Sequence, residues 1–564
     1  AVGRQAMFTN TTGTRNSVLG LNAMYTNTTG GCNVAIGGNA LYSNTTAANN
    51  TAVGACSLEA NTTGAENVAV GALAGDSNTT GSGNVFIGKE AGQANTTASG
   101  NVAIGQNTFD ANSTGAGNVA VGSAALGANT TGSSNSALGK DALAANTTAF
   151  GNTAVGRESL IASTTGDSNT AIGFKALCTN TTANENTAVG ASALRFNTTG
   201  AGNVSLGMSA MYSNTTGDFN IGIGRSTLQN NTTADNNTAV GYLALGENTT
   251  AEENTAVGRG ALAANTTGTP NTAVGSLTLT ANTTGASNTA MGRQSMQANT
   301  TGSHNVAVGR CSLKANTTAN SNVAIGTESL DVNTTGADNT AVGTNALGAN
   351  TTGASNTAMG SGALDSNTTG NYNTAQGVTS GGANTDGDGN TYIGHLAGSN
   401  ITTGCYNTYV GAETSASSAT ILFEHIFGRG GTGKGSNTFF SSASANGVFN
   451  QANATAWSQT SDRRIKKNIV NNNTGLDKIN QIQVRDFEYR TKAEVTDFEN
   501  AEAAYVDQSG VQIGVIAQEI ETIFPEMIIT QSTGVKTFNP DKLTFYLINA
   551  IKELKARIEE LENN

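Results

Sequence analysis

The sequence predicts a mainly β protein in which a long parallel β-solenoid precedes a smaller, more charged C-terminal domain. Three observations support this fold class. A glycine recurs every 17 residues through the first 411 residues, without insertion or deletion. The residues between these glycines are mostly small or β-branched, and the turn-forming sequence Asn-Thr-Thr occupies a fixed place among them. Beyond residue 411 the repeat gives way to a mixture richer in charged and aromatic side chains.

The repeat is defined by its column of glycines. The unit reads N-[T/V]-A-[V/I]-G-x-x-A-L-x-x-N-T-T-G-x-x, as in residues 254–270, and its places are numbered here from 1 (the first Asn) to 17. The column includes Gly3, Gly20, Gly37, Gly54, Gly71, Gly258 and Gly411, with 24 intervals of 17 residues between the first and last of these. An extra residue would shift every later unit, so the strict spacing indicates coils stacked in fixed register. At roughly 4.8 Å per coil the rod would be about 115 Å long.

Each coil is too short for a pair of helices, so we expect two short strands and two turns per coil. The glycine at position 5, and often the glycine after Asn-Thr-Thr, should supply positive φ at the corners. Asparagines at positions 1 and 12 should stack as side-chain amide ladders along the axis. A few coils depart from the unit: the leucine becomes Gly75, Gly92 or Gly398, Ser163 replaces an asparagine, and Gln376 replaces an aliphatic residue.

The strand pattern predicts self-association. Successive side chains of a strand point to opposite faces, so one of the adjacent residues Ala256 and Val257 should lie inside the coil and the other outside. Both are apolar, and Ala261 and Leu262 repeat the arrangement. A continuous apolar stripe is not tolerated on a soluble monomer. We therefore expect identical chains to cover it around a shared axis, without the number of chains being fixed by this argument.

Charge and composition argue against several partners. Residues 1–411 hold 12 basic and 20 acidic side chains, and residues 412–564 hold 15 and 19. The sequence shows no basic stripe, so no nucleic acid partner is expected. No apolar run approaches the roughly 20 residues of a membrane-spanning helix, so no membrane insertion is expected. Five cysteines and three histidines are scattered without paired spacing, which predicts neither a metal site nor a disulfide framework, and no cofactor.

The repeat core, N-x-A-[V/I]-G-x-x-A, resembles the left-handed β-roll heads of trimeric autotransporter adhesins and the repeats in shafts of some phage tail fibres. Those heads use a shorter unit, so the resemblance covers the pattern and not the length. It implies a homotrimer for the shaft, residues 1–411. The following segment, residues 412–460, contains Ile421-Leu422-Phe423 and Phe439-Phe440. It is expected to be either a β connector that locks the trimer or a tip that contacts a receptor.

Residues 461–564 hold three motifs in order. They are SDRRIKK (461–467), GVIAQEIETIFPEMI (514–528) and KLTFYLINAIKELKARIEELE (542–562). Together they resemble the intramolecular chaperone domain of endosialidases, phage tail spikes and related fibres, a self-cleaving peptidase family. The resemblance implies a small α+β chaperone domain that templates trimerisation of the β-rich stem and then cuts itself off.

The same resemblance assigns roles within the first motif. By position, Ser461 matches the nucleophile, Lys466 matches its general base, and the scissile bond is Thr460–Ser461. Serine is a poor nucleophile until a base takes its proton, and a lysine can do so when neighbouring cations or desolvation lower its pKa. Arg463 and Lys467 are cations of this kind.

The third motif predicts a helix with an apolar seam. Its apolar residues follow one another at alternating spacings of four and three: Leu547, Ile551, Leu554, Ile558 and Leu561. Such an a/d seam with charged flanks predicts a short coiled coil that joins the chains. Packing of the seam on its own domain is the alternative.

These observations lead to three functional hypotheses. The first is a trimeric extracellular fibre on a virion, a tail or receptor-binding fibre that grips a host-cell receptor or glycan. The second is a bacterial cell-surface adhesin fibre. The third is an ice-binding solenoid, against which stands the place of the paired threonines in presumed turns rather than on a flat strand face.

Overall fold

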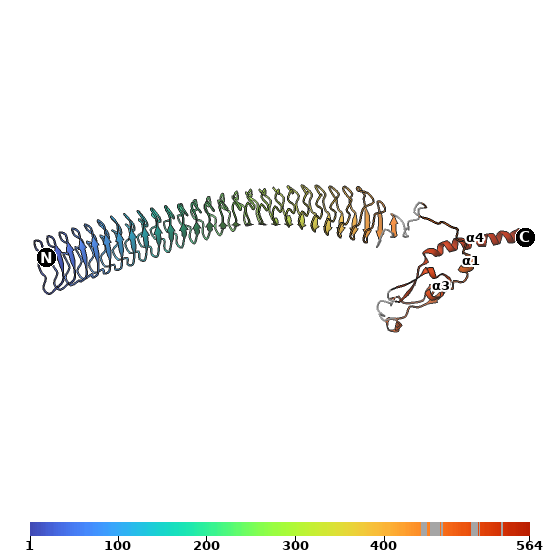
Figure 1. The fold of residues 1–564 in the computed structure, drawn as a ribbon, viewed down its shortest axis with the longest axis horizontal. Helices are drawn as coiled ribbons and strands as arrows, with labels where there is room; N and C mark the ends of the chain where they lie inside the picture. Colours follow the sequence, from blue (N-terminus) through green and yellow to red (C-terminus); the bar gives the residue numbers. More distant parts are fainter. Residues whose placement is uncertain are drawn as a thin grey trace. The chain divides into compact units, whose positions relative to one another are not determined.

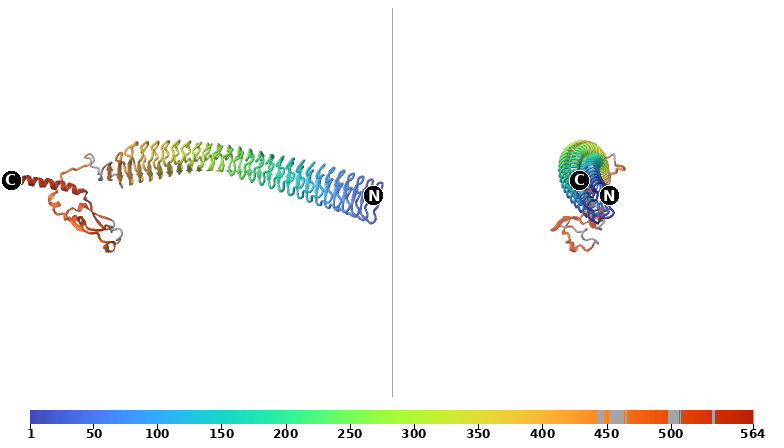
Figure 2. Two further views of the ribbon diagram at one scale, coloured as in Figure 1. Left: turned by 180° about the vertical axis from the view of Figure 1, so that it is seen from behind. Right: turned by 90° about the vertical axis from the view of Figure 1, so that its left-hand side faces the viewer.

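The computed structural model describes residues 1–441, 448–451, 463, 466–497, 506, 508–531 and 534–563. The chain divides into two compact units, Ala1–Gln459 and Thr460–Asn564. The first unit is a stack of similar coils, drawn from blue to orange in Figure 1, and it confirms a parallel β-solenoid with 17-residue coils. Viewed from behind and from its end, the stack is gently curved (Figure 2).

Each coil contributes one short strand to a single sheet that runs the length of the unit. From β1 to β25, neighbouring strands are parallel and offset by 17 residues, as in the pair Thr238↔Thr255. The sheet contains β1 (Ser17–Leu19), β2 (Val34–Ile36), β3 (Thr51–Val53), β4 (Val68–Val70), β5 (Val85–Ile87), β6 (Val102–Ile104), β7 (Val119–Val121), β8 (Ser136–Leu138), β9 (Thr153–Val155), β10 (Thr170–Ile172), β11 (Thr187–Val189), β12 (Val204–Leu206), β13 (Ile221–Ile223), β14 (Thr238–Val240), β15 (Thr255–Val257), β16 (Asn271–Val274), β17 (Asn288–Met291), β18 (Val306–Val308), β19 (Val323–Ile325), β20 (Thr340–Val342), β21 (Thr357–Met359), β22 (Thr374–Gln376), β23 (Thr391–Ile393), β24 (Thr408–Val410), β25 (Glu424–Phe427), β26 (Thr438–Ser441) and β27 (Val448–Gln451). Only β27 runs antiparallel to its neighbour.

The prediction of two strands per coil is wrong, because the second side of each coil is built from consecutive turns. In the coil of residues 254–270, Gly260 and Leu262 have φ of 65° and 51°. These left-handed residues break the alternation of a strand, so Ala261 and Leu262 are both fully buried. On the strand the expected alternation holds, since Ala256 is fully buried while its neighbour is 36% exposed.

The two glycine columns have different causes. Gly258 has a φ of 135°, and a Cβ built on it would lie 2.4 Å from the carbonyl oxygen of Gly275 in the next coil. Position 5 therefore admits only glycine. The glycine after Asn-Thr-Thr has no positive φ, contrary to expectation. At that position a Cβ on Gly268 would lie 2.3 Å from the next coil's carbonyl oxygen, yet other coils place Ala251 there, so the position requires a small residue rather than a special φ.

Two rows of buried asparagines join the coils. At position 12 each amide donates to the asparagine of the preceding coil, as Asn61 Nδ2 does to Asn44 Oδ1 at 3.1 Å. At position 1 the side chain bonds the backbone: Asn50 Oδ1 accepts the N–H of Asn67 at 2.9 Å, and Asn50 Nδ2 donates to the carbonyl of Gly64 at 2.9 Å. In several coils the position-1 amide also donates to the preceding asparagine, as Asn407 Nδ2 does to Asn390 Oδ1 at 3.0 Å. The amide ladder is therefore confirmed at position 12 and in part at position 1, where bonds to the backbone accompany it.

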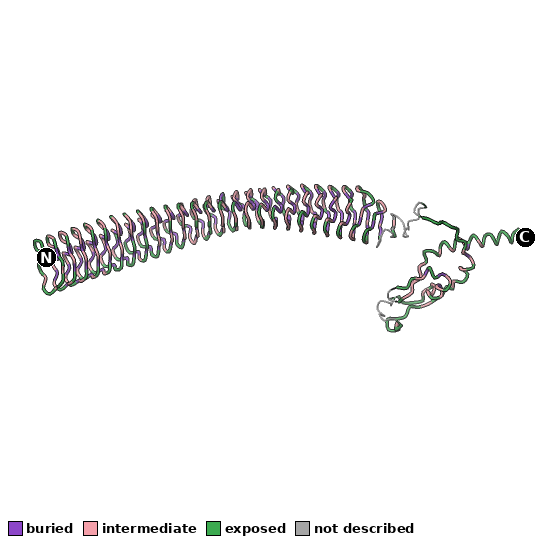
Figure 3. Tube along the Cα trace, viewed as in Figure 1, coloured by how far each residue is buried: buried purple, intermediate pink, exposed green. Residues whose placement is uncertain are grey.

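Between these rows the core is a thin column of small apolar side chains. Positions 3, 8 and 9 supply it, as Ala239, Ala244 and Leu245 do in one coil. Buried residues run along the inside of the stack in Figure 3, with exposed residues outside them. Because so little apolar volume is available in each coil, any large side chain must be compensated nearby.

Such compensation explains the coils that lack leucine. Phe86 stands at position 3, where most coils have alanine, and it is fully buried. A Cβ on Gly75 would lie 2.6 Å from the Phe86 ring, and one on Gly92 would lie 2.3 Å from it. Tyr392 is accommodated in the same way by Gly398, where a Cβ would lie 2.4 Å from the ring. The Phe86 ring therefore occupies the space that two leucines would fill, one in its own coil and one in the coil before it.

The sheet continues past Gly411. β25 pairs with β24 at the same offset of 17 residues, and Gly428 extends the glycine column with a φ of 122°. The repeat unit does not predict this coil, because the residues around Gly428 no longer fit the unit. Phe440 of β26 is fully buried, and the ring of Phe439 stacks on that of Phe427 with centroids 5.1 Å apart. The first part of the connector is thus an extension of the solenoid.

Glu424 closes this end of the solenoid. It replaces the asparagine of position 1 and is fully buried. Its carboxylate accepts the hydroxyl of Tyr409 at 3.1 Å, the N–H of Ser417 at 3.1 Å and the N–H of Gly435 at 2.9 Å. Burial, reinforced by this carboxylate, raises the pKa of Tyr409, so its hydroxyl remains a donor. Three donors compensate the buried charge.

The second unit is a small α+β domain, as predicted. Its elements are α1 (Leu476–Ile479), β28 (Arg485–Phe487), η2 (Lys492–Glu494), β29 (Gln512–Gly514), α3 (Ala517–Ile523), η3 (Pro525–Met527), β30 (Ile528–Thr530), β31 (Lys536–Phe538), η4 (Pro540–Lys542) and α4 (Leu543–Glu562). β28 pairs with β29 and β30 with β31, both antiparallel.

The compensation around Phe86 gives a first prediction. Phe86→Ala should cost about 3–5 kcal/mol in stability, because it leaves a cavity that a stacked coil cannot collapse. Adding Gly75→Leu and Gly92→Leu should recover most of this loss in urea unfolding. The two leucines alone, with Phe86 kept, should destabilise by overpacking. A triple variant no more stable than Phe86→Ala would contradict the compensation.

The interrupted ladder gives a second prediction. Ser163 replaces a position-12 asparagine, and its Oγ and the Oδ1 of Asn146 are fully buried without a hydrogen-bond partner. Ser163→Asn should restore the ladder and add about 1–3 kcal/mol of local stability. Amide hydrogen exchange should therefore slow in peptides covering these coils. Ser168→Asn, at an exposed turn position, is the control and should leave exchange unchanged.

Candidate functional site

The predicted nucleophile and scissile bond, Ser461 and Thr460, lie outside the described residues, and their roles stay predictions. Lys466 is described and exposed, and its backbone N–H donates to the carbonyl of Arg463 at 3.2 Å. The backbone of Lys466 is thus in contact with that of Arg463, one of the cations expected to lie near it.

The motif at 514–528 forms the centre of the domain. It spans the end of β29, α3, η3 and the start of β30. Ile520, Phe524 and Met527 are buried, with α1, β31 and α4 supplying partly buried side chains around them. Lys478 of α1 lies over the Phe524 ring, 5.1 Å from its centroid, and donates to the carbonyl of Ile523 at 3.0 Å. The motif is therefore the folding core of the domain rather than a catalytic surface.

Tyr546 fixes α4 to this core. Its ring lies 4.6 Å from that of Phe524, centroid to centroid, and its hydroxyl donates to Glu526 Oε1 at 2.7 Å. The hydrogen bond lowers the pKa of Glu526 and raises the pKa of Tyr546. At neutral pH Glu526 is therefore ionised and Tyr546 keeps its proton, as the hydrogen bond requires.

A second junction joins α1 to α4, and sequence reasoning missed it. The backbone N–H of Leu476 donates to Glu553 Oε2 at 2.7 Å. The side chain of Asn549 donates to two carbonyls just before α1, at 2.7 and 3.1 Å. A Cβ on Gly475 would lie 2.6 Å from the backbone nitrogen of Ala550. The only signal in the sequence is this glycine ahead of a short helix, which identifies no partner.

The seam of α4 does not pack on its own domain. Its five residues are exposed, from 41% for Leu547 to 77% for Leu561. Leu543, Tyr546 and Ala550 form the face that packs on the domain instead. The alternative of packing within the domain is therefore wrong for these side chains, whose apolar surface is exposed in the single chain.

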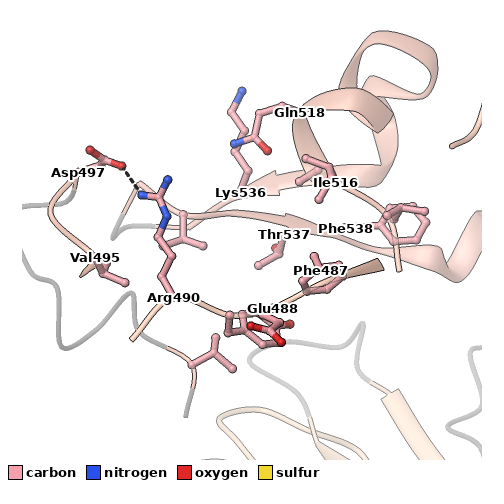
Figure 4. A pocket seen from close by; sticks show the side chains of 15 residues that line it. Phe487, Glu488, Arg490, Val495, Asp497, Ile516, Gln518, Lys536, Thr537 and Phe538 are labelled. Carbon is pink, nitrogen blue, oxygen red and sulfur yellow. Dashed lines mark hydrogen bonds and ion pairs between the residues drawn. The ribbon is translucent and has the colours of Figure 1, made fainter. Parts of the chain in front are cut away.

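A pocket of about 570 Å³ lies between β28, the start of α3 and β31. Phe487 and Phe538 contribute apolar surface to it (Figure 4). Arg490 and Asp497 form an ion pair at 3.0 Å at the pocket, and Lys536, also in its lining, pairs with Glu521. Lys466 is not among the described residues that line the pocket.

Comparison with known proteins agrees with the geometry of the second unit. Residues 461–529 match a family model described as chaperone of endosialidase. No curated protein and no solved structure matches the chain. Among the helices of the described ranges, none is both long and apolar enough to cross a membrane. A parallel β-solenoid shaft followed by a C-terminal region that matches the chaperone-of-endosialidase model fits a protein of the tail-fibre or endosialidase chaperone type.

Proposed function

We propose that three copies of this chain form an extracellular fibre, a tail or receptor-binding fibre of a virion, and that the C-terminal domain aligns the chains and then releases itself. The match of residues 461–529 to the chaperone family carries this proposal. The exposed seam of α4 supports it, because an apolar helix face of this length favours burial against other chains.

Release takes place at the Thr460–Ser461 bond. Lys466 accepts the hydroxyl proton of Ser461 as Oγ attacks the carbonyl carbon of Thr460. The C–N bond breaks, the α-amino group of Ser461 takes up a proton, and an ester joins Thr460 to Ser461 Oγ. Water then hydrolyses the ester, which leaves a new carboxylate on Thr460 and restores the serine hydroxyl. The reaction occurs once per chain and needs no cofactor.

The order of events follows from the shaft. Its hydrogen bonds join residues 17 apart within one chain, but trimerisation requires three long rods to associate in the same register, which is slow without a starting point. A domain that trimerises first holds the chains together and lowers the entropy cost of alignment. Cleavage afterwards leaves a shaft whose persistence is kinetic.

Self-cleavage is tested by intact mass after expression. The wild-type chain should separate into residues 1–460 and 461–564, whereas Ser461→Ala and Lys466→Ala should keep the full mass. Lys467→Ala is the matched control and should still be cut, although more slowly, because it removes a neighbouring cation and leaves the base in place. A wild-type chain that never loses its last 104 residues would contradict the assignment.

The α4 seam is tested in the full-length Ser461→Ala chain, so that the domain stays attached. Ile551→Asp with Leu554→Asp should convert a trimer to a monomer in analytical ultracentrifugation, because charges would replace apolar seam contacts. The domain itself should still fold, since both side chains are exposed within the chain. Lys552→Asp with Lys555→Asp, on the flanks of the seam, should remain trimeric. A trimer that survives the seam changes would exclude α4 as its contact.

A further inference from the structure

The outward face of the solenoid sheet is apolar along its whole length. Position 4 of the unit points outward and is aliphatic or aromatic in every coil from Val2 to Phe427, with the exception of Gln376. Its side chains stay partly exposed, such as Ile223 at 38% and Met291 at 44%. This row continues over the full length of the shaft, so it is larger than the apolar patches that soluble monomers expose.

The two edges of this face carry opposite charge. Because the strands are parallel, all their C-terminal ends lie along one edge and all their N-terminal ends along the other. Position 6 follows each strand closely, and its basic residues are Arg4, Lys89, Lys140, Arg157, Arg225, Arg259, Arg293, Arg310 and Arg429, with no acid among them. Positions 16 and 17 precede each strand, and their acidic residues are Glu66, Asp167, Glu185, Asp218, Asp235, Glu252, Glu253, Asp338 and Asp388, against the single base Arg15.

The basic row corrects an expectation from the linear sequence, in which no basic stripe was visible. Its members are at least 17 residues apart along the chain, and the coiling brings them onto one edge. Some of them are satisfied within the chain: Lys89, Lys140 and Arg157 pair with the acids that follow them, and Arg310 pairs with Glu328.

In the middle of the shaft, several charged side chains on each edge form no ion pair within the described residues 1–441. Within residues 1–441, no ion pair involves Arg225, Arg259 or Arg293, which are all exposed, and none involves Glu252 or Glu253. The strand β15 has Glu252 and Glu253 just before it and Arg259 just after it. Unpaired acids and unpaired bases thus flank the same coils on opposite sides of the apolar face.

We infer that a second copy of this chain packs parallel and in register against this face, with its acidic edge beside the basic edge of the first. Rotation of one rod about an axis along its length brings unlike edges together, at the same coil, in every member of a closed ring. An antiparallel pair meeting face to face would place basic against basic and acid against acid. A free polyanion is a poorer occupant, because the acidic edge across the same face repels it.

The inference rests on the proposed trimer and specifies its surface and direction. The test compares three charge-reversed forms of the full chain: Arg225→Glu with Arg259→Glu, Glu252→Arg with Glu253→Arg, and all four together. The readout is the temperature at which the processed shaft loses its SDS-resistant oligomer band. Each reversed edge should lower this temperature, because like charges then meet, and the four-fold variant should return toward the wild-type value.

The controls separate a lost interface from a lost fold. Lys314→Glu reverses a cation at position 10, on the turn side of the coil, and should not change the temperature. Circular dichroism at low temperature should show the same β content in all forms. Single-edge variants as stable as the wild type, or a four-fold variant no better than either edge alone, would overturn the inference and leave the proposed trimer standing. A wild-type shaft that is monomeric after processing would overturn both.

Discussion

The shaft depends on buried asparagine amides whose partners lie one coil away. Most coils place two of them in the interior, one bonded to the neighbouring amide and one to the neighbouring backbone. A buried amide that loses its partner costs about 1–3 kcal/mol, and a single inserted residue would remove two of them at once. The amides therefore explain why the spacing of 17 residues is kept from Gly3 to Gly428 without an exception. Glycine at position 5 complements them, since any Cβ there would collide with the next coil.

Each unit has a well-bonded or well-packed interior, and each also has a row of apolar side chains that the chain itself leaves exposed. Along the rod, hydrogen bonds pair every coil with its neighbours, and Glu424 closes the last of them with three donors. Across the rod, the row at position 4 stays exposed. In the chaperone domain Phe524 and its neighbours form a core, yet the seam of α4 is also exposed. Both units thus leave a row of apolar side chains exposed in the single chain.

Much of the shaft could be predicted, because its contacts join neighbouring coils and recur every 17 residues. The glycine column, the position-12 ladder and the opposite facing of Ala256 and Val257 all follow from periodicity. The second side of the coil was not, because left-handed φ at Leu262 runs against the usual preference of a bulky residue and is stabilised only by stacking. The exchange of volume between Phe86 and Gly75 links residues 11 apart, a relation that appears once the coil path is known. In the C-terminal domain the helix and core motifs were identified, while the contact of Glu553 with Leu476 depends on folding across 77 residues.

The uniform coil also has a genetic consequence. Since each unit makes its hydrogen bonds only with the units beside it, recombination that adds or removes a whole unit of 17 codons changes the length of the rod by about 4.8 Å and leaves every remaining contact intact. In a homo-oligomer every chain would gain or lose the same unit, so the coils of different chains would remain aligned. The length of the rod is thus a heritable quantity that can vary in equal steps, independently of the C-terminal domain.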